Sequence, residues 1–269
     1  MALFQIDYFS VSLSRIINFN ILIPNDIPSG MSAGNPHYLR GVKTLFLLHG
    51  YSGSNRDWLF SSAASELSIK YNLAMIMPSG ENSFYLDGKG TGKAFCRFVG
   101  EELVQYTCKT FGLSDKKEDI FIGGYSMGGF GALHTALAYP DTFGKAVALS
   151  SALIIHDIKN MPMDSHDGFA DYDYYQSVFG DLKNLDTSEN NPEYLIRKLK
   201  DAGREIPGIF MTCGTEDFLI EQNRAFYQFL CNENIDVNYQ EHPGAHNWEF
   251  WNRYMEPAIL WLLNIEERS

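Results

Sequence analysis

Basic residues are scarce in this sequence of 269 residues: 21 Lys and Arg stand against 33 Asp and Glu, which gives a formal net charge of −12. Nucleic-acid phosphates require clustered Lys and Arg, so this balance disfavours nucleic acid as a partner. It disfavours an anionic membrane surface for the same reason. A neutral small molecule is the partner that fits best, although acidity on its own also keeps a protein in solution.

The sequence also lacks long hydrophobic runs. No uninterrupted apolar segment is long enough to cross a bilayer, and residues 1–10 have no basic stretch followed by an apolar one, as a secretory leader would. We therefore expect a cytoplasmic protein without a membrane partner. The composition leaves the oligomeric state open, and a homo-oligomer is compatible with it.

Cysteine is limited to four residues, none of which forms a Cys-x-x-Cys pair: Cys96, Cys108, Cys213 and Cys231. Each lies among residues with a strand or helix pattern, where a small buried thiol packs well. We therefore expect neither disulfides nor a zinc site, and we expect no other metal and no cofactor.

Internal repeats, low-complexity stretches and linkers rich in Pro, Gly or Ser are missing as well. Apolar residues make up 45% of the chain and charged residues 20%, a balance that supports a large core. The length suits one large α/β domain, so we expect a single domain over residues 1–269.

What the sequence does contain is an alternation of strand-like and helix-like segments. Short apolar runs such as residues 44–48 and 209–211 are typical of a parallel sheet that is covered on both faces. Strands are predicted over residues 17–24, 43–50, 73–78, 119–125, 145–150, 208–213 and 236–241. Helices are predicted over residues 57–71, 92–111, 127–138, 193–202, 219–232 and 248–265. This order predicts an α/β fold with a doubly wound, mostly parallel sheet.

The alternation breaks between residues 151 and 206. Asp, Asn, Met and Tyr are interspersed through residues 164–191 before a helical pattern resumes. We expect this segment to form a short, cap-like insertion that arches over the C-terminal edge of the sheet.

The strongest signal for chemistry is a Gly-x-Ser-x-Gly motif centred on Ser126. A strand-like run precedes it and a helix-like run follows it, and the flanking Gly124 and Gly128 leave room for a very sharp turn. Such a turn exposes the serine hydroxyl at the N-terminus of a helix, which favours negative charge. A glycine-rich turn with an incidental serine is the alternative, but the strand–turn–helix setting favours a nucleophile. The motif in this setting predicts an α/β-hydrolase fold.

A nucleophilic serine needs a histidine base and a carboxylate, and in this fold both follow it in the chain. Asp217 comes shortly after the strand-like residues 209–213. We prefer it to Glu216 because the next residues are apolar and one carboxylate must turn inward; helix capping is its alternative role. His246 lies in a loop before the last helix, where it reaches over the sheet edge, whereas His242 lies nearer the strand and is the weaker candidate. The predicted catalytic residues are therefore Ser126, Asp217 and His246.

The tetrahedral intermediate of ester hydrolysis requires two backbone amides that form an oxyanion hole. Met127 supplies one directly after the nucleophile, and the loop after an early central strand supplies the second. In that loop Gly50 lets the backbone approach a substrate, and the amide of Tyr51 is the expected donor. His49 is interpreted as a residue that fixes the loop through hydrogen bonds.

Four segments together resemble one family: residues 49–53 (HGYSG), 124–129 (GYSMGG), 213–219 (CGTEDFL) and 246–248 (HNW). They are similar to motifs of the tributyrin esterase and acetylesterase family, which is related to S-formylglutathione hydrolases (esterase D) and feruloyl esterases. The similarity runs from Phe4 to Trp261. It implies cleavage of short acyl esters without a metal, including acetyl groups on carbohydrates, by way of an acyl-enzyme. It also implies that Trp58, Phe84 and Tyr85 belong to an aromatic wall of the substrate pocket.

The sequence thus predicts a serine carboxylic ester hydrolase that acts on acetyl to butyryl esters. Its expected partner is a small-molecule ester, such as an acetylated or feruloylated saccharide. The alternative enzymes are an S-formylglutathione hydrolase and a feruloyl esterase with the same catalytic residues. Glutathione usually needs basic residues in its pocket, and this acidic chain has few near the motifs. The alternative outside catalysis is a silent binding module, which the intact set of catalytic residues disfavours.

Overall fold

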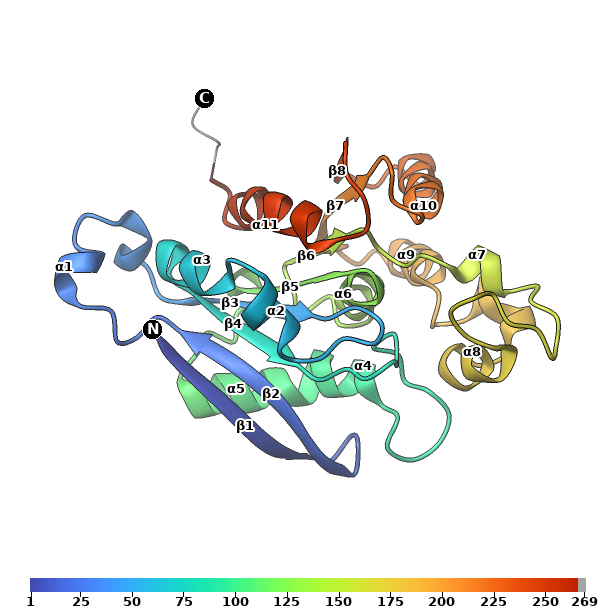
Figure 1. The fold of residues 1–269 in the computed structure, drawn as a ribbon, viewed down its shortest axis with the longest axis horizontal. Helices are drawn as coiled ribbons and strands as arrows, with labels where there is room; N and C mark the ends of the chain where they lie inside the picture. The colour runs from blue at the N-terminus through green and yellow to red at the C-terminus, as the bar shows by residue number, and fades with distance from the viewer. Residues whose placement is uncertain (266–269) are drawn as a thin grey trace.

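The structure, a computed structural model, is built around one eight-stranded sheet (Figure 1). It describes residues 1–265, so the last four residues of the expected 1–269 domain lie outside the described residues. The strands are β1 (Ala2–Ser10), β2 (Arg15–Ile23), β3 (Lys43–Leu48), β4 (Leu73–Pro78), β5 (Ile120–Tyr125), β6 (Lys145–Leu149), β7 (Gly208–Gly214) and β8 (Val237–His242). Their order across the sheet is β1-β2-β4-β3-β5-β6-β7-β8.

The six strands from β4 to β8 in this order run parallel, and the first two form an antiparallel hairpin at one edge. The central strands are buried along almost their whole length; in β4 and β5 every residue is buried. Continuous apolar runs form such strands because both faces of the sheet are covered by helices. The predicted doubly wound, mostly parallel sheet is therefore confirmed.

Helices pack on both faces of this sheet. Those on one face are α2 (Asp57–Ser61), α3 (Ala64–Tyr71) and α11 (Trp248–Leu262). Those on the other are α4 (Phe95–Arg97), α5 (Leu103–Phe111), α6 (Met127–Ala138), α9 (Pro192–Asp201) and α10 (Ile220–Asn232). The remaining helical segments are α1 (Ser29–Ser32), α7 (Ile155–Ile158), α8 (Tyr172–Phe179), the 3₁₀ turns η1 (Pro36–Leu39), η3 (Lys117–Asp119) and η4 (Leu182–Thr187), and the π turn η2 (Phe98–Glu102). None of the helices within residues 1–265 combines the length and the apolar character that a bilayer crossing requires.

Two predicted helices are interrupted. The helix expected over residues 57–71 divides into α2 and α3, because Ser62 is extended and its hydroxyl engages Trp58 O and Ala64 N. The helix expected over residues 92–111 begins only at Phe95 and contains the π turn η2. At Ser62 a side chain competes for backbone groups, and in η2 the ring of Tyr139 packs directly on Gly100. Hydrophobic periodicity records neither effect.

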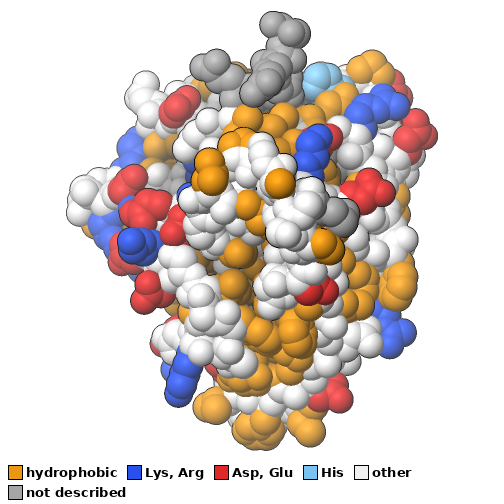
Figure 2. All heavy atoms as spheres, turned by 90° about the vertical axis from the view of Figure 1, so that its left-hand side faces the viewer, with side chains coloured by type: hydrophobic (Ala, Val, Ile, Leu, Met, Phe, Trp, Pro, Cys, Tyr) orange, Lys and Arg blue, Asp and Glu red, His pale blue; other side chains and the backbone are white. Residues whose placement is uncertain are grey.

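The hairpin of β1 and β2 includes a strand that the sequence analysis did not predict. One face of β1 packs on α5, where Tyr8 and Tyr106 have ring centroids 4.5 Å apart, while Phe9 remains 61% exposed. Figure 2 shows apolar side chains gathered at the bottom of the molecule, where Figure 1 places the turn between β1 and β2. The alternation of β1 is blurred because both of its faces carry apolar residues.

The expected insertion over residues 151–206 contains α7, α8, η4 and α9. Its last helix, α9, packs on α6 and belongs to the layer that covers the sheet. The earlier part, with α7 and α8 at the right of Figure 1, extends beyond the sheet and supplies walls of the pocket described below. The arching portion is therefore shorter than predicted, because the helix that returns the chain to the next parallel strand must pack on the sheet.

Candidate active site

Ser126 lies in the turn between β5 and α6 and has an unusual backbone conformation. Its φ of 56° and ψ of −123° are rarely adopted by a residue with a side chain. The turn is held on both sides, because Ser126 N donates to Leu149 O on β6 (2.9 Å) and Phe130 N donates to Ser126 O in the first turn of α6 (3.1 Å). The partly exposed hydroxyl is thus carried at the N-terminus of a 12-residue helix.

The glycines that flank Ser126 are required by close backbone contacts. A side chain on Gly124 would collide with the carbonyl of Gly128, and one on Gly128 would collide with the carbonyls of Leu48 and His49. The helix α6 therefore begins against the end of β3, closer than any other residue type allows. This close approach brings the loop after β3 next to Ser126.

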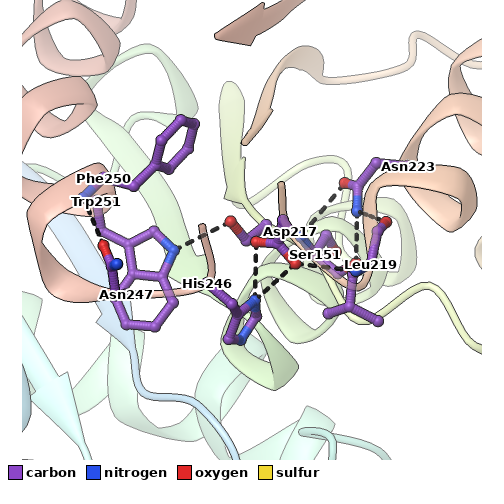
Figure 3. A network of polar contacts seen from close by, with 9 residues as sticks. Ser151, Asp217, Leu219, Asn223, His246, Asn247, Phe250 and Trp251 are labelled. Carbon is purple, nitrogen blue, oxygen red and sulfur yellow. Dashed lines mark hydrogen bonds and ion pairs between the residues drawn. The ribbon is translucent and has the colours of Figure 1, made fainter. Parts of the chain in front are cut away.

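His246 and Asp217 are joined by a hydrogen bond. The Nδ1 atom of His246 lies 3.0 and 2.9 Å from the two carboxylate oxygens of Asp217 (Figure 3). Asp217 is only 2% exposed and follows β7, whereas His246 is partly exposed and precedes α11. A buried carboxylate at Nδ1 leaves Nε2 as the nitrogen that is available for chemistry.

Asp217 is held in its ionised form by its neighbours. Burial on its own would raise the pKa of this carboxyl, but hydrogen bonding and charge from His246, the Leu219 amide at 2.9 Å and the Ser150 hydroxyl hold the pKa below its ordinary value. Ser150 is itself fixed by Trp251, whose Nε1 donates to Ser150 Oγ at 3.1 Å. The carboxylate therefore has a set of donors that orient it toward His246.

The two alternatives to these residues lie differently. Glu216 is exposed, and its carboxylate accepts from the amide of Gly244 in the His246 loop. His242 stacks on Tyr254, with ring centroids 4.4 Å apart, and neither His242 nor Glu216 lines the pocket described next. Both residues support the loop that carries His246.

A cavity of about 620 Å³ opens over these elements. It brings together the predicted residues Tyr51, Phe84, Ser126, Met127 and His246. Its other lining residues are Ser52, Ala152, Ile154, Asp157, Asp167, Gly168, Phe169, Tyr175, Phe218, Leu219 and Gln222. The volume is that of a small-molecule site with apolar walls and a few polar groups.

Two backbone amides of this cavity are available to a ligand. Among the hydrogen bonds between residues 1–265, none uses the N–H of Tyr51 or of Met127. Met127 is the first residue of α6, so its amide points out of the helix end with partial positive charge. Both residues line the cavity next to Ser126.

His49 fixes the loop that carries Tyr51. It is 1% exposed; its Nε2 lies 2.8 Å from Gly80 N, which donates to it, and its Nδ1 lies 2.8 Å from Gly50 O. This pattern requires a proton on Nδ1 alone, and burial lowers the pKa of the ring. His49 is therefore a neutral structural residue, as its sequence position indicates.

Residues 10–262 match the model of the Esterase family, described as "Putative esterase". The chain belongs to this family. It is 43% identical over 267 residues to the "Acetyl esterase" of Caldicellulosiruptor saccharolyticus, across 99% of this chain and 100% of that protein. Together these findings establish the chain as a carboxylic ester hydrolase and confirm the family that the motifs indicated.

Solved structures show the same fold as this esterase. Fluorophosphonate-binding serine hydrolase F (FphF) of Staphylococcus aureus, with substrate bound, has a TM-score of 0.83 at 28% identity, with 98% of each chain covered. The S-formylglutathione hydrolase FrmB of Staphylococcus aureus has a TM-score of 0.81 at 27% identity, covering 98% of this chain and 99% of that one. With the sheet described above, these similarities confirm the predicted α/β-hydrolase fold.

Three residues that were expected to contact substrate do not line the cavity of this esterase. Trp58 is 1% exposed and Tyr85 is fully buried; Trp58 Nε1 donates to Leu48 O at 2.9 Å, and the Tyr85 hydroxyl accepts from His49 N at 2.9 Å. A side chain on Gly50 would collide with the ring of Tyr125. All three shape the loop after β3 without lining the cavity. Trp58 and Tyr85 were expected in the lining, but aromatic residues near a motif fill the core as readily as they line a pocket.

Several lining residues of the esterase had not been recognised from the sequence. Asp157, Asp167 and Tyr175 come from the insertion, and Gln222 comes from α10. No local pattern distinguishes these side chains from surface residues, since only the folded path of the insertion brings them to Ser126. Phe218 is different, because its place next to Asp217 was a signal that it lies near the site. Within residues 1–265, no group of three or more His, Cys, Asp and Glu side chains is arranged to hold a metal ion.

Proposed function

We propose that this esterase hydrolyses short-chain acyl esters through a triad of Ser126, His246 and Asp217. The observation that carries the proposal is the buried carboxylate of Asp217 at Nδ1 of His246, in a chain whose Ser126 and His246 line the same cavity. The strained turn at Ser126 is the second support, since such strain is characteristic of nucleophile turns.

In the first half of the reaction, Ser126 Oγ attacks the carbonyl carbon of the ester while His246 Nε2 takes its proton. The electron pair of the carbonyl bond moves onto the oxygen, which the amides of Tyr51 and Met127 stabilise. When the tetrahedral intermediate collapses, the bond to the alcohol oxygen breaks, and His246 gives the proton to the departing alcohol. The acyl group stays on Ser126.

In the second half, a water molecule takes the place of the alcohol. His246 accepts one proton of the water as its oxygen attacks the acyl carbon, and then returns that proton to Ser126 Oγ. The products are the free acid and the original enzyme. Asp217 keeps the imidazole oriented and stabilises its charged form in both halves, which its depressed pKa favours.

We infer acetyl to butyryl groups as the acyl half, with acetyl groups on carbohydrates among the substrates. The 43% identical relative is an acetyl esterase, which supports this class. The lining described above contains two carboxylates, Asp157 and Asp167, and no Lys or Arg. That surface favours neutral esters and disfavours an anionic glutathione thioester, so the S-formylglutathione reaction ranks second. The feruloyl reaction ranks second because the 43% identical relative is an acetyl esterase.

The triad is tested by matched pairs of variants in p-nitrophenyl acetate hydrolysis. Ser126→Ala and His246→Ala should lower kcat by about 10⁴-fold or more, because the residues of a triad act as a unit. His242→Ala, at the end of β8 and outside the cavity, should lose less than about threefold. Glu216→Gln, the matched control for Asp217→Asn, should also lose less than about threefold. Equal rates in wild type and Ser126→Ala would remove the triad, and equal rates no higher than the buffer blank would favour a silent binding module.

The acyl preference is tested separately with a series of ester substrates. With the alcohol held constant, kcat/KM should be highest among acetyl, propionyl and butyryl esters and should fall for octanoyl and palmitoyl esters. S-formylglutathione and a feruloyl ester serve as the competing substrates. A higher kcat/KM for palmitoyl, feruloyl or formyl-thioester substrates would overturn the short-chain assignment without affecting the triad.

A further inference from the structure

Two phenylalanines lie exposed at the cavity that contains Ser126. Phe169 is 62% exposed and Phe218 is 56% exposed, and both line the cavity. Their rings are stacked, with centroids 5.5 Å apart and planes 21° from parallel. Two large apolar faces left together in solvent at the opening of a binding site indicate a surface that a ligand covers.

Phe218 is coupled to the predicted catalytic residues by its position. It follows Asp217 directly, and its ring centroid lies 4.6 Å from that of His246. One side of the His246 ring is therefore bordered by an aromatic ring. A group that leaves next to His246 therefore departs beside the ring of Phe218.

Phe169 is held in place by the loop that carries it. Asp167 Oδ1 accepts from the amides of Phe169 and Ala170, each at 2.9 Å, and Asp167 Oδ2 accepts from the Tyr175 hydroxyl at 2.7 Å. Burial would raise the pKa of Asp167, but these donors hold it below its ordinary value, so the carboxylate stays charged. The turn is closed by a bridge between His166 and Asp171, and it presents Phe169 in one position.

We propose that Phe169 and Phe218 form a platform that binds the alcohol half of the substrate. This rests on the proposed triad: His246 gives its proton to the alcohol oxygen, so the alcohol half lies on the His246 side of the ester bond. That is the side on which Phe218 lies. The platform selects alcohols that carry a ring with an apolar face, either an aryl ring or a pyranose, over alcohols without a ring.

The platform favours a ligand with a ring because the phenyl rings of Phe169 and Phe218 are flat and nearly parallel to each other. A linear alkyl alcohol covers little of a phenyl face, whereas a ring covers most of one and displaces its hydration water. Aromatic pairing of this kind corresponds to a change in kcat/KM of about three- to tenfold for each ring contact. Specificity for the alcohol would then come from the insertion and from the residue after Asp217, separately from the acyl half.

The test compares three acetate esters of primary alcohols: benzyl acetate, methyl 6-O-acetylglucopyranoside and ethyl acetate. Because all three leave as primary alcohols, their ring content is the main difference. Phe169→Ala and Phe218→Ala should each lower kcat/KM for one or both ring esters by about tenfold, mainly through KM, while ethyl acetate changes less than about twofold. Phe169→Tyr should retain the wild-type values, since it keeps the ring.

Phe60→Ala is the matched control, because Phe60 is 74% exposed on α2 and does not line the cavity. It should leave all three substrates unchanged. A loss confined to benzyl acetate identifies an aryl platform, and one confined to the glucoside identifies a pyranose platform. Equal effects on ethyl acetate and on the ring esters, or no effect on any, would overturn the platform. Failure of the triad is seen separately, as activity that survives Ser126→Ala.

Discussion

Ser126 is held in its strained conformation by hydrogen bonds to the helix that follows it and to residues more than twenty positions later in the sequence. Backbone strain of this kind costs about 1–3 kcal/mol, so the surrounding structure must supply that free energy. The carbonyl of Ser126 accepts from Phe130 N and from Ala152 N, and its amide donates to Leu149 O. The predicted nucleophile is therefore stabilised by the start of α6, by the end of β6 and by the segment that follows β6.

A substitution at Ser150 tests the effect of a single hydroxyl on Asp217. Ser150→Ala removes a hydroxyl that lowers the pKa of the buried Asp217 carboxyl, so that pKa should rise toward its ordinary value. We expect kcat for p-nitrophenyl acetate to fall about tenfold with KM little changed, which is the effect of about 1.5 kcal/mol for a bond to a charged group. The measurement is steady-state kinetics at neutral pH, with the thermal midpoint checked in parallel.

Ser151→Ala provides the control for that experiment. Ser151 Oγ is buried and has no hydrogen-bond partner among residues 1–265, so its removal costs no bond. We expect wild-type kinetics for Ser151→Ala. Equal losses in both variants would mean that the segment after β6 tolerates no change, and that Ser150 has no specific role in orienting Asp217.

Sequence reasoning at this scale worked where chemistry fixes chain order. The flanking glycines mark Ser126 as the candidate nucleophile, and in this fold the carboxylate and the histidine follow it at strand ends. Their assignment stays a prediction, and the chain order supports it. Phe169 could not be inferred in the same way. Its position depends on the turn that Asp167 organises, and that turn is determined by tertiary contacts with Tyr175.

At the scale of elements, Glu102 joins the N-terminal hairpin to the helix that covers it. Its carboxylate accepts from Tyr8 Oη (3.0 Å), Ser10 Oγ (3.0 Å), Val11 N (2.7 Å) and Ser12 N (2.9 Å). Glu102 ends the π turn η2, which aims its side chain at the turn between β1 and β2. Burial alone would raise the pKa of Glu102, but these donors hold it below the ordinary value of 4.5.

Glu102→Gln should lower the free energy of unfolding by about 2 kcal/mol at pH 7, because an amide cannot accept from all of these donors. The carboxylate contributes stability above the ordinary glutamate pKa of 4.5, and that contribution is lost as the pH falls through the lower pKa of the folded state. The difference between wild type and variant should therefore shrink below pH 4.5. Urea unfolding at several pH values measures it.

The neighbouring Glu101→Gln is the control for this effect. Glu101 forms an exposed ion pair with Arg97 at 3.3 Å, a contact that contributes at most about 0.5 kcal/mol. We expect no pH-dependent difference for this variant. A loss of stability in Glu102→Gln that stays constant down to the lowest pH would contradict the role of the carboxylate charge.

Elements could be predicted where burial gives one clear pattern. The strands β3, β4 and β5 are buried runs and were predicted to within two residues at each end. The strand β1 was missed because Leu3 and Phe9 are exposed while Ile6 and Tyr8 pack inward, so the alternation of polar and apolar residues is lost. The short helices α7 and α8 were missed because they depend on packing within the insertion.

At the scale of the whole molecule, the charge of the chain and the charge of the cavity have the same sign. The formal net charge is −12, and the two carboxylates that line the cavity with Ser126, Asp157 and Asp167, are not accompanied there by any Lys or Arg among residues 1–265. A negative field of this kind slows the approach of anionic substrates and leaves neutral ones unaffected. The predicted single domain, cytoplasmic location and homo-oligomer stay predictions.

The charge of a substrate should therefore decide how strongly its kcat/KM depends on the salt concentration. For 4-acetoxybenzoate, which is anionic, kcat/KM should rise severalfold between about 10 mM and about 300 mM NaCl, because the Debye length shortens over this range. For methyl 4-acetoxybenzoate, its neutral counterpart, kcat/KM should change little. The comparison is made at one pH with both substrates. Equal salt effects on the two would show that the acidic cavity has no influence on substrate choice.

The central claim, that Ser126 is the nucleophile of this esterase, is tested most directly by covalent capture. Diisopropyl fluorophosphate reacts with an activated serine, which displaces fluoride and retains the phosphoryl group. We predict that activity disappears in step with the attachment of one phosphoryl group to the peptide that contains Ser126, as mass spectrometry would show, and that Ser126→Ala is not labelled. Inactivation with the label on another residue, or undiminished labelling of Ser126→Ala, would contradict the account.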